Sequence, residues 1–492
     1  MNIENYSVEL NENDMPLLQG LKDYSDRHIA CFDVPGHVKN RGVKVLNEFL
    51  GENLMKMDIN SSPYMDNVSK PNGIIKKAQD LLAQAYECDK AFFVTNGTTQ
   101  AIQAMILSII NPKDKILLPR NIHKSVINAL ILSGGEPVYI QPEFDECLGI
   151  SLNVSYLSVK NELEKNSDIK AIFLLNPTYY GACCDLEKII NLCKKHSVLV
   201  LVDEAHGAHF PFHDDLPPSA MKLEADMAAV SMHKTGGALT QSSALLVNEE
   251  NIDVEKVSQT LNMLQSTSAS YLLMSSIDGA RYNLINNGRS QLSKVLNISK
   301  YAKYRINKIP GIKVIGHNNC KREGLNFLDE TKLCINVKDL NVTGFKVYDI
   351  LYQNFDIQVE LGDLYNVLAL ISLGTTKGDV DRLINALEII SKKYKNSAVL
   401  ECSYLKPINP TVKISPRDAY YSEKESLNID NSINRICGEN IMAYPPGIPI
   451  ISPGEVITKE ILDYIKVLKN SNAYLTDMRD KELNTILVIK EK

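Results

Sequence analysis

The sequence predicts an α/β fold built on a mostly parallel sheet that is covered by helices on both faces. Strand-like runs alternate with helical patterns from about residue 73 onward, and central runs such as 198–202 are apolar throughout. Polar clusters follow the strand-like runs directly, as Asp203 and His206 follow 198–202. Because ligands of open α/β sheets bind at the carboxyl ends of the strands, the sequence also predicts a site at that edge.

The composition indicates an ordinary globular protein in a reducing compartment. Of 492 residues, 44% are hydrophobic and 23% are charged, and 53 basic against 59 acidic residues give a net charge of −6. This balance argues against a nucleic-acid or membrane partner. The first twenty residues lack a signal-peptide pattern, and no apolar run has membrane-spanning length. Ten scattered cysteines without a CxxC pair favour the cytoplasm.

The length predicts two to four domains. We expect an N-terminal arm at 1–70, a large domain at 71–314, a small α+β domain at 315–400 and a C-terminal α+β domain at 401–492. The arm shows one short helical pattern at about 17–24 and otherwise little regular period. Such an arm is expected to cover another surface of the protein or of a partner subunit.

Periodicity places the individual elements of the large and small domains. Helices are predicted at 74–86, 101–110, from after Ser125 to 132, 186–194, about 290–309 and 379–394. Strands are predicted at 91–94, 115–119, 138–140, 171–175, 198–202, 226–230, 311–315, 332–337 and 367–373.

Lys234 is the most informative single residue. It follows the strand at 226–230 and lies between Ser231 and the glycines 236 and 237, with His233 beside it. A lysine held in a small pocket at a strand end can act as a nucleophilic amine that forms a Schiff base with a carbonyl cofactor such as pyridoxal phosphate (PLP). The alternative is an ordinary lysine in a glycine-rich loop.

The other strand ends supply the groups that PLP needs. Asp203 ends a buried strand about thirty residues earlier, and a carboxylate there can keep the pyridine nitrogen protonated. The turn between the strand at 91–94 and the next helix can bind a phosphate. The hydrogen-bond donors to the phosphate are predicted to be Thr98 and Thr99 of this turn together with Ser231 and His233. His123 is predicted to lie flat on the cofactor ring. Helix caps and core hydrogen bonds are the competing explanations.

Two other motifs offer competing interpretations. Residues 203–206 spell the DEAH signature of helicases, but the chain has no GK[ST] phosphate loop. Asp203, His206, His209 and His213 have spacings that suit metal ligands on a helix. Pro211 interrupts a helix at that point, so we expect no metal.

Taken together, the motifs resemble the Orn/Lys/Arg decarboxylase family in its short form, without the N-terminal wing domain of the larger members. The runs are FFVTNGTT (92–99), PRNIHKSV (119–126), NPTYYG (176–181), LVDEAHG (201–207), SMHKTGGALTQSS (231–243) and YPPGIPIISPGE (444–455). The resemblance covers essentially the whole chain. It implies an aspartate aminotransferase-like PLP fold and decarboxylation of a basic amino acid, arginine before lysine or ornithine. It also implies a place in polyamine biosynthesis and a homodimer or higher homo-oligomer.

The resemblance also implies residue roles. Lys234 would hold the cofactor covalently, Asp203 would bind the pyridine nitrogen, and His123 would stack on the ring. Thr98, Thr99, Ser231 and His233 would bind the phosphate, and His206 would lie beside the phenolic oxygen. Lys234, His123, Asp203 and His206 are the expected catalytic residues. Glu455 and His37 are the expected substrate-binding residues, with Glu455 meeting the cationic head group.

One departure bears on the reaction. The family tends to carry a second aspartate and a histidine where this chain has Asn67 and Ser69, after Asp66. The substrate or the reaction could differ if that stretch reaches the site. Two alternatives therefore stay open: another PLP reaction on a basic amino acid, by amino transfer or by elimination and cyclisation, and a PLP-binding protein without turnover.

Overall fold

The computed structural model describes residues 10–62, 64–316, 323–394, 408–444 and 447–491. The chain forms two compact units. The first takes its residues from Met1–Ser108, Gly207–Asp214 and Pro218–Gln291, and the second from Ile109–His206, Asp215–Pro217 and Leu292–Lys492. The four predicted domain boundaries remain a prediction.

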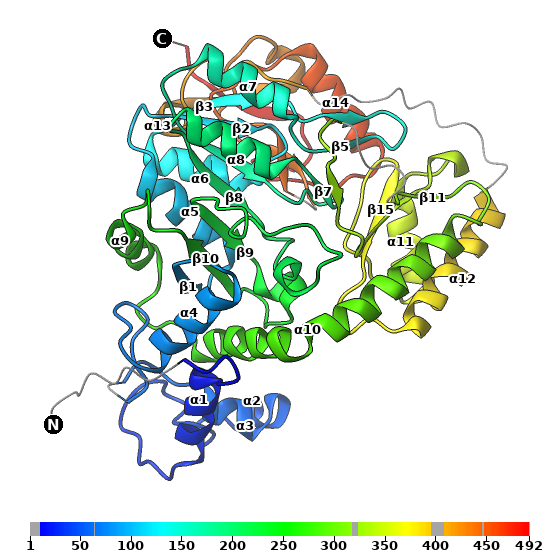
Figure 1. Cartoon of the computed structure of the whole chain (residues 1–492). Coiled ribbons are helices and arrows are strands. Elements are labelled where there is room, and N and C mark those ends of the chain that lie inside the picture. The colour runs from blue at the N-terminus through cyan, green and yellow to red at the C-terminus, as the bar shows by residue number, and fades with distance from the viewer. Residues whose placement is uncertain (1–9, 63, 317–322, 395–407, 445–446, 492) are drawn as a thin grey trace. The chain divides into compact units, whose positions relative to one another are not determined.

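The first unit begins with four helices, α1 (Pro16–Asp26), α2 (Lys44–Leu50), α3 (Glu52–Met57) and α4 (Ile74–Ala85) (Figure 1). The predicted helices at 17–24 and 74–86 are confirmed. The expectation of little regular structure in the rest of the arm was wrong, because α2 and α3 lie there. Both are short and lack a side-chain N-cap, and α2 buries none of its residues, so the usual sequence signals are missing.

The strands of the first unit are antiparallel. Their order is β1 (Lys90–Val94), β10 (Ser243–Val247) and β9 (Met227–Val230), with Phe92 opposite Leu245 and Leu246 opposite Ala228. Helix α5 (Gly97–Ile109) follows β1, the π-helical turn η2 (Met232–Gly236) follows β9, and α9 (Val254–Leu264) follows β10. Strand β10 was not predicted.

The second unit contains the parallel strands. Their order is β8 (Leu199–Asp203), β6 (Ile169–Leu175), β2 (Lys115–Pro119) and β3 (Glu136–Ile140). Four of the five residues of β2 and of β8 are buried, as the unbroken apolar runs require of a sheet covered on both faces. The connecting helices are α6 (Lys124–Ser133), α7 (Tyr156–Lys165) and α8 (Leu186–Lys195), and the short strands β4 (Phe144–Asp145) and β5 (Ile150–Ser151) form a hairpin.

The second unit also contains separate hydrophobic cores. The strand order β11 (Lys313–Val314), β13 (Lys332–Asn336), β15 (Asn366–Leu370), β14 (Leu361–Gly362) packs with α11 (Gly344–Phe355) and α12 (Lys377–Tyr394). The C-terminal core contains α14 (Lys459–Asn470) and part of five strands. The five strands are β16 (Lys424–Asn428), β17 (Ile441–Ala443), β18 (Ile448–Ile451), β19 (Leu475–Thr476) and β20 (Thr485–Ile489). The remaining elements are β7 (Ala182–Cys183), β12 (Phe327–Leu328), α13 (Pro416–Tyr421) and the 3₁₀ turns η1 (Phe210–Phe212), η4 (Lys338–Leu340) and η5 (Ile429–Asn431).

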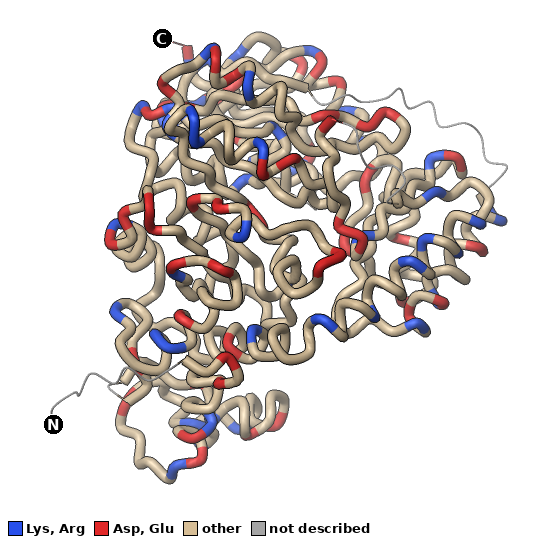
Figure 2. Tube along the Cα trace, in the orientation of Figure 1, with Lys and Arg blue, Asp and Glu red and all other residues tan. Residues whose placement is uncertain are grey.

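Helix α10 (Tyr271–Ile306) is 36 residues long, and its residues are divided between the two units. The sequence predicted only its last part, from about residue 290. Basic and acidic residues alternate along the backbone tube of both units (Figure 2). Within the described ranges, no helix is long and apolar enough to cross a membrane.

Candidate active site

Lys234 lies in the π-helical turn η2, directly after β9. Its backbone N–H donates to the carbonyl oxygen of Ser231 at 3.1 Å, and Gly237 ends the turn with a φ of +91° and an N–H bond to Met232. A side chain at Gly237 would be strained in this left-handed conformation. Single π turns are rare in proteins, and many of those that occur lie at functional sites. The turn therefore fixes the backbone of a lysine that is itself only half-buried.

A pair of hydroxyl groups lies close together in the same unit. The Thr98 and Ser231 hydroxyl oxygens are 2.9 Å apart, and both residues are buried, whereas Thr99 is exposed. Thr98 belongs to the first turn of α5, whose unpaired N–H groups attract anions. His233 is held by Ser242, because its backbone N–H donates to the Ser242 carbonyl at 3.1 Å and its Nδ1 lies 3.0 Å from the same oxygen.

Asp203 and His123 belong to the second unit. Asp203 ends β8 opposite Leu175 of β6, is only 4% exposed, and accepts a hydrogen bond from the Ala205 N–H at 3.1 Å. His123 is the N-cap of α6, where its Nδ1 accepts from the Ser125 N–H at 3.2 Å. In a neutral ring the proton is therefore on Nε2. A Cβ at Gly447 would lie 3.4 Å from that Nε2, so glycine leaves the ring edge uncrowded.

His206 has a cationic neighbour that the sequence did not point to. The Nζ of Lys332, a fully buried side chain, lies 3.1 Å from His206 Nδ1, and the Tyr179 ring packs edge-on against the imidazole at 5.0 Å between centroids. A protonated Lys332 can only donate, so Nδ1 accepts and the imidazole proton is on Nε2. Burial raises the pKa of Tyr179, and the nearby Asp203 carboxylate adds to the effect.

Glu455 is paired with an arginine. Its Oε2 lies 3.0 Å from Arg120 Nη2 and accepts from the Ser452 N–H at 2.7 Å, and the two side chains are 2% and 5% exposed. Burial raises the pKa of Glu455, and the Arg120 charge opposes that shift. Arg120 also donates to the Ile450 carbonyl at 3.1 Å. Arg120 Nη1 and Glu455 Oε1 have no hydrogen-bond partner among the described residues.

The two arm positions singled out in the sequence have local partners. His37 Nε2 lies 3.1 Å from Asp58 Oδ2, and Nδ1 contacts the Lys39 carbonyl. The Asp66 carboxylate accepts five backbone N–H bonds, and four of the donors lie at the start of α4 or just before it, which makes Asp66 a helix cap. Asn67 accepts a bond from the Ser69 N–H, so the altered positions are used within a turn.

The metal alternative depends on side chains that converge and on histidines that share one helical face. Within the described parts of the chain, no three His, Cys, Asp or Glu side chains converge into a possible metal site. The segment after His206 is a short 3₁₀ turn at Phe210–Phe212 rather than one helical face.

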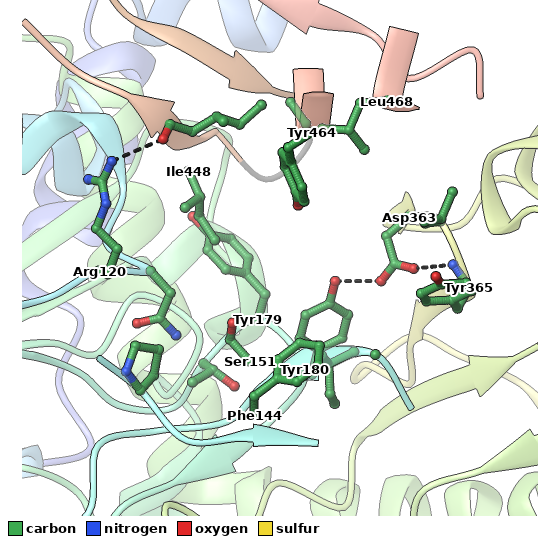
Figure 3. Close-up of a pocket in the computed structure, with 18 of the residues that line it drawn as sticks. Arg120, Phe144, Ser151, Tyr179, Tyr180, Asp363, Tyr365, Ile448, Tyr464 and Leu468 are labelled. Atoms are coloured by element: carbon green, nitrogen blue, oxygen red, sulfur yellow. Dashed lines mark hydrogen bonds between the residues drawn. The ribbon is translucent and has the colours of Figure 1, made fainter. Parts of the chain in front are cut away.

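A cavity of about 210 Å³ lies within the second unit. Figure 3 shows Arg120 at one side of it, Asp363 at the other, and aromatic rings between them. Its aromatic lining consists of Phe144, Tyr179, Tyr180, Phe345, Tyr365 and Tyr464. The sequence predicted none of this lining except that polar residues would gather at strand ends.

Thr98, Ser231, His233 and Lys234 lie in the first unit, and His123, Asp203, His206 and Glu455 lie in the second. Within the units, the structure brings Thr98 to Ser231, His206 to Tyr179 and Lys332, and Glu455 to Arg120.

Comparison with known proteins gives full-length matches. The family model described as Orn/Lys/Arg decarboxylase, major domain, matches residues 15–379, and the model for the C-terminal domain of the same family matches 398–475. The arginine decarboxylase of Bacillus anthracis is 41% identical over 485 residues, which cover 98% of each chain. The arginine decarboxylase of Bacillus subtilis (strain 168) is 41% identical over 488 residues, covering 98% of this chain and 99% of the relative.

Solved structures agree on the fold. The lysine decarboxylase of Francisella novicida has a TM-score of 0.84 at 22% identity and covers 97% of this chain and 82% of its own. The alanine–glyoxylate aminotransferase of Nostoc sp. has a TM-score of 0.51 at 19% identity over 64% of this chain and 85% of its own. The predicted aminotransferase-like α/β fold is confirmed.

Proposed function

Because the chain belongs to the Orn/Lys/Arg decarboxylase family, we propose that it is a PLP-dependent enzyme that converts arginine to its amine and CO2. Decarboxylation of a basic amino acid is the activity of the family, and arginine is favoured over lysine and ornithine. The observation that carries the choice of arginine is the 41% identity, over nearly the whole of each chain, to two relatives named arginine decarboxylase.

The residues present fit PLP. The first turn of α5 and the paired hydroxyls of Thr98 and Ser231 offer donors for a phosphate, and Thr99 and His233 are the further candidates. Lys234 offers an amine in a fixed turn, and Asp203 offers a buried carboxylate for the pyridine nitrogen. When bound, PLP supplies an electron sink for the electron pair that departing CO2 leaves on Cα.

The chain's own residues have four proposed tasks. Lys234 Nζ holds the cofactor covalently and later delivers a proton to Cα. Asp203 keeps the pyridine nitrogen protonated, because a carboxylate that accepts a hydrogen bond from that N–H stabilises the cationic form of the ring. His123 covers the ring, and His206 presents Nε2–H, a tautomer set by Lys332, beside the phenolic oxygen.

Glu455 and His37 remain candidates for binding the substrate. Glu455 already has Arg120 as a counter-ion, so its negative charge is largely neutralised within the protein. His37 has partners at both nitrogens within the arm, and its substrate role requires those contacts to change.

A homodimer is proposed from the surface of the arm. Nine large apolar side chains between residues 32 and 64 are exposed: Phe32, Val34, Val43, Val45, Leu46, Phe49, Leu50, Leu54 and Tyr64. Phe32 is 99% and Phe49 is 83% exposed. Clustered exposure of this kind on a globular chain is typical of a surface that a second subunit covers.

Incubation with PLP and each of the three amino acids tests the activity. Mass spectrometry should find CO2 and the decarboxylated amine in equal amounts, fastest from arginine, and the Lys234→Ala variant should release neither. A keto acid product would replace the proposal with amino transfer. Borohydride reduction and peptide mapping should place the phosphopyridoxyl group on Lys234, and labelling of another lysine would refute the assignment.

A further inference from the structure

We propose that the cavity in the second unit binds the cationic head group of the basic amino acid, with Asp363 as its counter-ion and tyrosine rings as its walls. This inference rests on the proposed function for the identity of the ligand. It assigns the head group to a carboxylate that no sequence motif singled out, in place of Glu455.

The first support is the electrostatics of Asp363. Its carboxylate accepts the Tyr180 O–H at 2.6 Å, the backbone N–H groups of Tyr365 and Asn366 at 2.7 Å each, and the Asn366 side-chain amide at 3.1 Å. Across the described residues, every donor to Asp363 is therefore neutral. A negative charge withdrawn from water and lacking a cation is costly, and a cationic ligand removes that cost.

The second support is the lining of the cavity. Tyr180 reaches Asp363 directly, and Tyr464 of α14 points into the space from the opposite side (Figure 3). Phe144 closes the lower edge in that view. Aromatic faces around a carboxylate favour organic cations, because the ring quadrupole attracts a guanidinium or ammonium group. A divalent metal would require several oxygen ligands instead.

The third support is the position of the cavity relative to the proposed catalytic residues of the same unit. Tyr179 lines the cavity and packs against His206 at 5.0 Å between ring centroids. Arg120 also lines the cavity, and its guanidinium is a cation that pairs with Glu455. A zwitterion with a cationic side chain can place its carboxylate toward Arg120 and its head group toward Asp363.

The size of the cavity permits such a ligand. One water needs roughly 10–15 Å³ of the volume that is open to the centre of a water-sized sphere. By the same measure the cavity has about 210 Å³, so it holds many waters and accommodates a small amino acid. Gly149 maintains part of this volume. A Cβ there would lie 2.4 Å from the Tyr365 ring, and the residue has a φ of +66°.

The decisive experiment combines kinetics and binding with the full-length protein. In Asp363→Asn, the KM for arginine should rise at least tenfold, and KM should change more than kcat. The amine product, agmatine, should bind the wild type in calorimetry and bind the variant at least tenfold more weakly. Asp339→Asn is the matched control, because Asp339 pairs with exposed Lys313 in the same unit. Arginine KM and agmatine affinity within twofold of wild type for Asp363→Asn would overturn the inference.

A second pair of variants, at Tyr464, tests the inference even if Asp363→Asn fails to fold. Tyr464→Leu should weaken agmatine binding more than Tyr464→Phe does, because only phenylalanine retains the aromatic face. Equal effects of the two substitutions would contradict the cation–π contact.

The design separates this inference from the activity. If wild type releases no CO2 from any of the three amino acids, the proposed function fails. Agmatine binding that depends on Asp363 would still support a cation site. If wild type decarboxylates arginine but the Asp363 and Tyr464 variants bind agmatine normally, the inference fails and the activity stands.

Discussion

At the scale of single residues, the buried pair of Arg120 and Glu455 has the largest expected cost of disruption. We expect Glu455→Gln to lower the free energy of unfolding by about 3–5 kcal/mol, because it leaves the Arg120 charge buried without a partner. Denaturant titration followed by circular dichroism measures the loss. Asp339→Asn is the control, since its pair with Lys313 is exposed and is worth at most about 1 kcal/mol. Equal losses in both variants would mean that burial of the pair is unimportant.

Asp363 gives the stability a defined pH dependence. Burial is the main reason that its pKa in the folded protein is raised above 3.8, and the Tyr180 hydrogen bond opposes the shift. Between the ordinary and the raised pKa, the folded state binds a proton that the unfolded state has lost. The stability of the wild type relative to Asp363→Asn should therefore fall as pH rises through that window and then level off.

Thermal unfolding of both proteins across that pH range measures the difference. Agmatine should raise the melting temperature of the wild type above the window, where the carboxylate is charged. A stability difference that is independent of pH would show that Asp363 does not titrate on folding.

The sequence could predict those site residues that follow a strand or form a motif. Lys234 and Asp203 were found because polar residues directly after apolar strands gather at one sheet edge. Lys332 and Asp363 could not be found, because their partners His206 and Tyr180 are 126 and 183 positions away. The pairing of Glu455 with Arg120, 335 positions earlier, likewise depends on tertiary structure.

At the scale of elements, Asp66 controls the start of α4. We expect Asp66→Ala to destabilise the helix start by about 1–2 kcal/mol, because its five backbone N–H donors lose their acceptor. Amide hydrogen exchange at residues 73–76 should then accelerate by roughly 5- to 30-fold, since about 1.4 kcal/mol is a factor of ten. Ser69→Ala should leave those rates unchanged, because Ser69 contributes its backbone carbonyl to Asn262. Unchanged exchange in Asp66→Ala would rule out the cap.

Two elements that the sequence missed have different physical reasons. Strand β10 is fully buried and only five residues long, and its start in small polar residues hides the boundary. The first half of α10 contains serine and asparagine residues of low helix propensity, so tertiary contacts sustain it. One such contact is the Asp278 carboxylate, which accepts the Leu17 and Leu18 N–H groups of α1 at 2.9 and 3.2 Å.

At the scale of the whole molecule, the arm is expected to hold two copies together. Phe49→Asp should weaken the homodimer, because it puts a charge into the proposed apolar contact. Sedimentation velocity at micromolar concentration should show monomer in the variant and dimer in the wild type. Ile389→Asp is the control, since Ile389 is an exposed apolar residue of α12 in the other unit. A monomeric wild type, or dissociation by both variants alike, would refute the assignment of the interface.

The central claim is that the chain decarboxylates arginine with Lys234 as its essential amine. Its most direct test is turnover of arginine labelled with ¹³C in the carboxyl group, in heavy water, with PLP present. All of the label should appear as CO2, and the amine should carry one carbon-bound deuterium from solvent; Lys234→Ala should yield neither. Retention of the label in a keto acid or a cyclised product, or full activity of Lys234→Ala, would contradict the account.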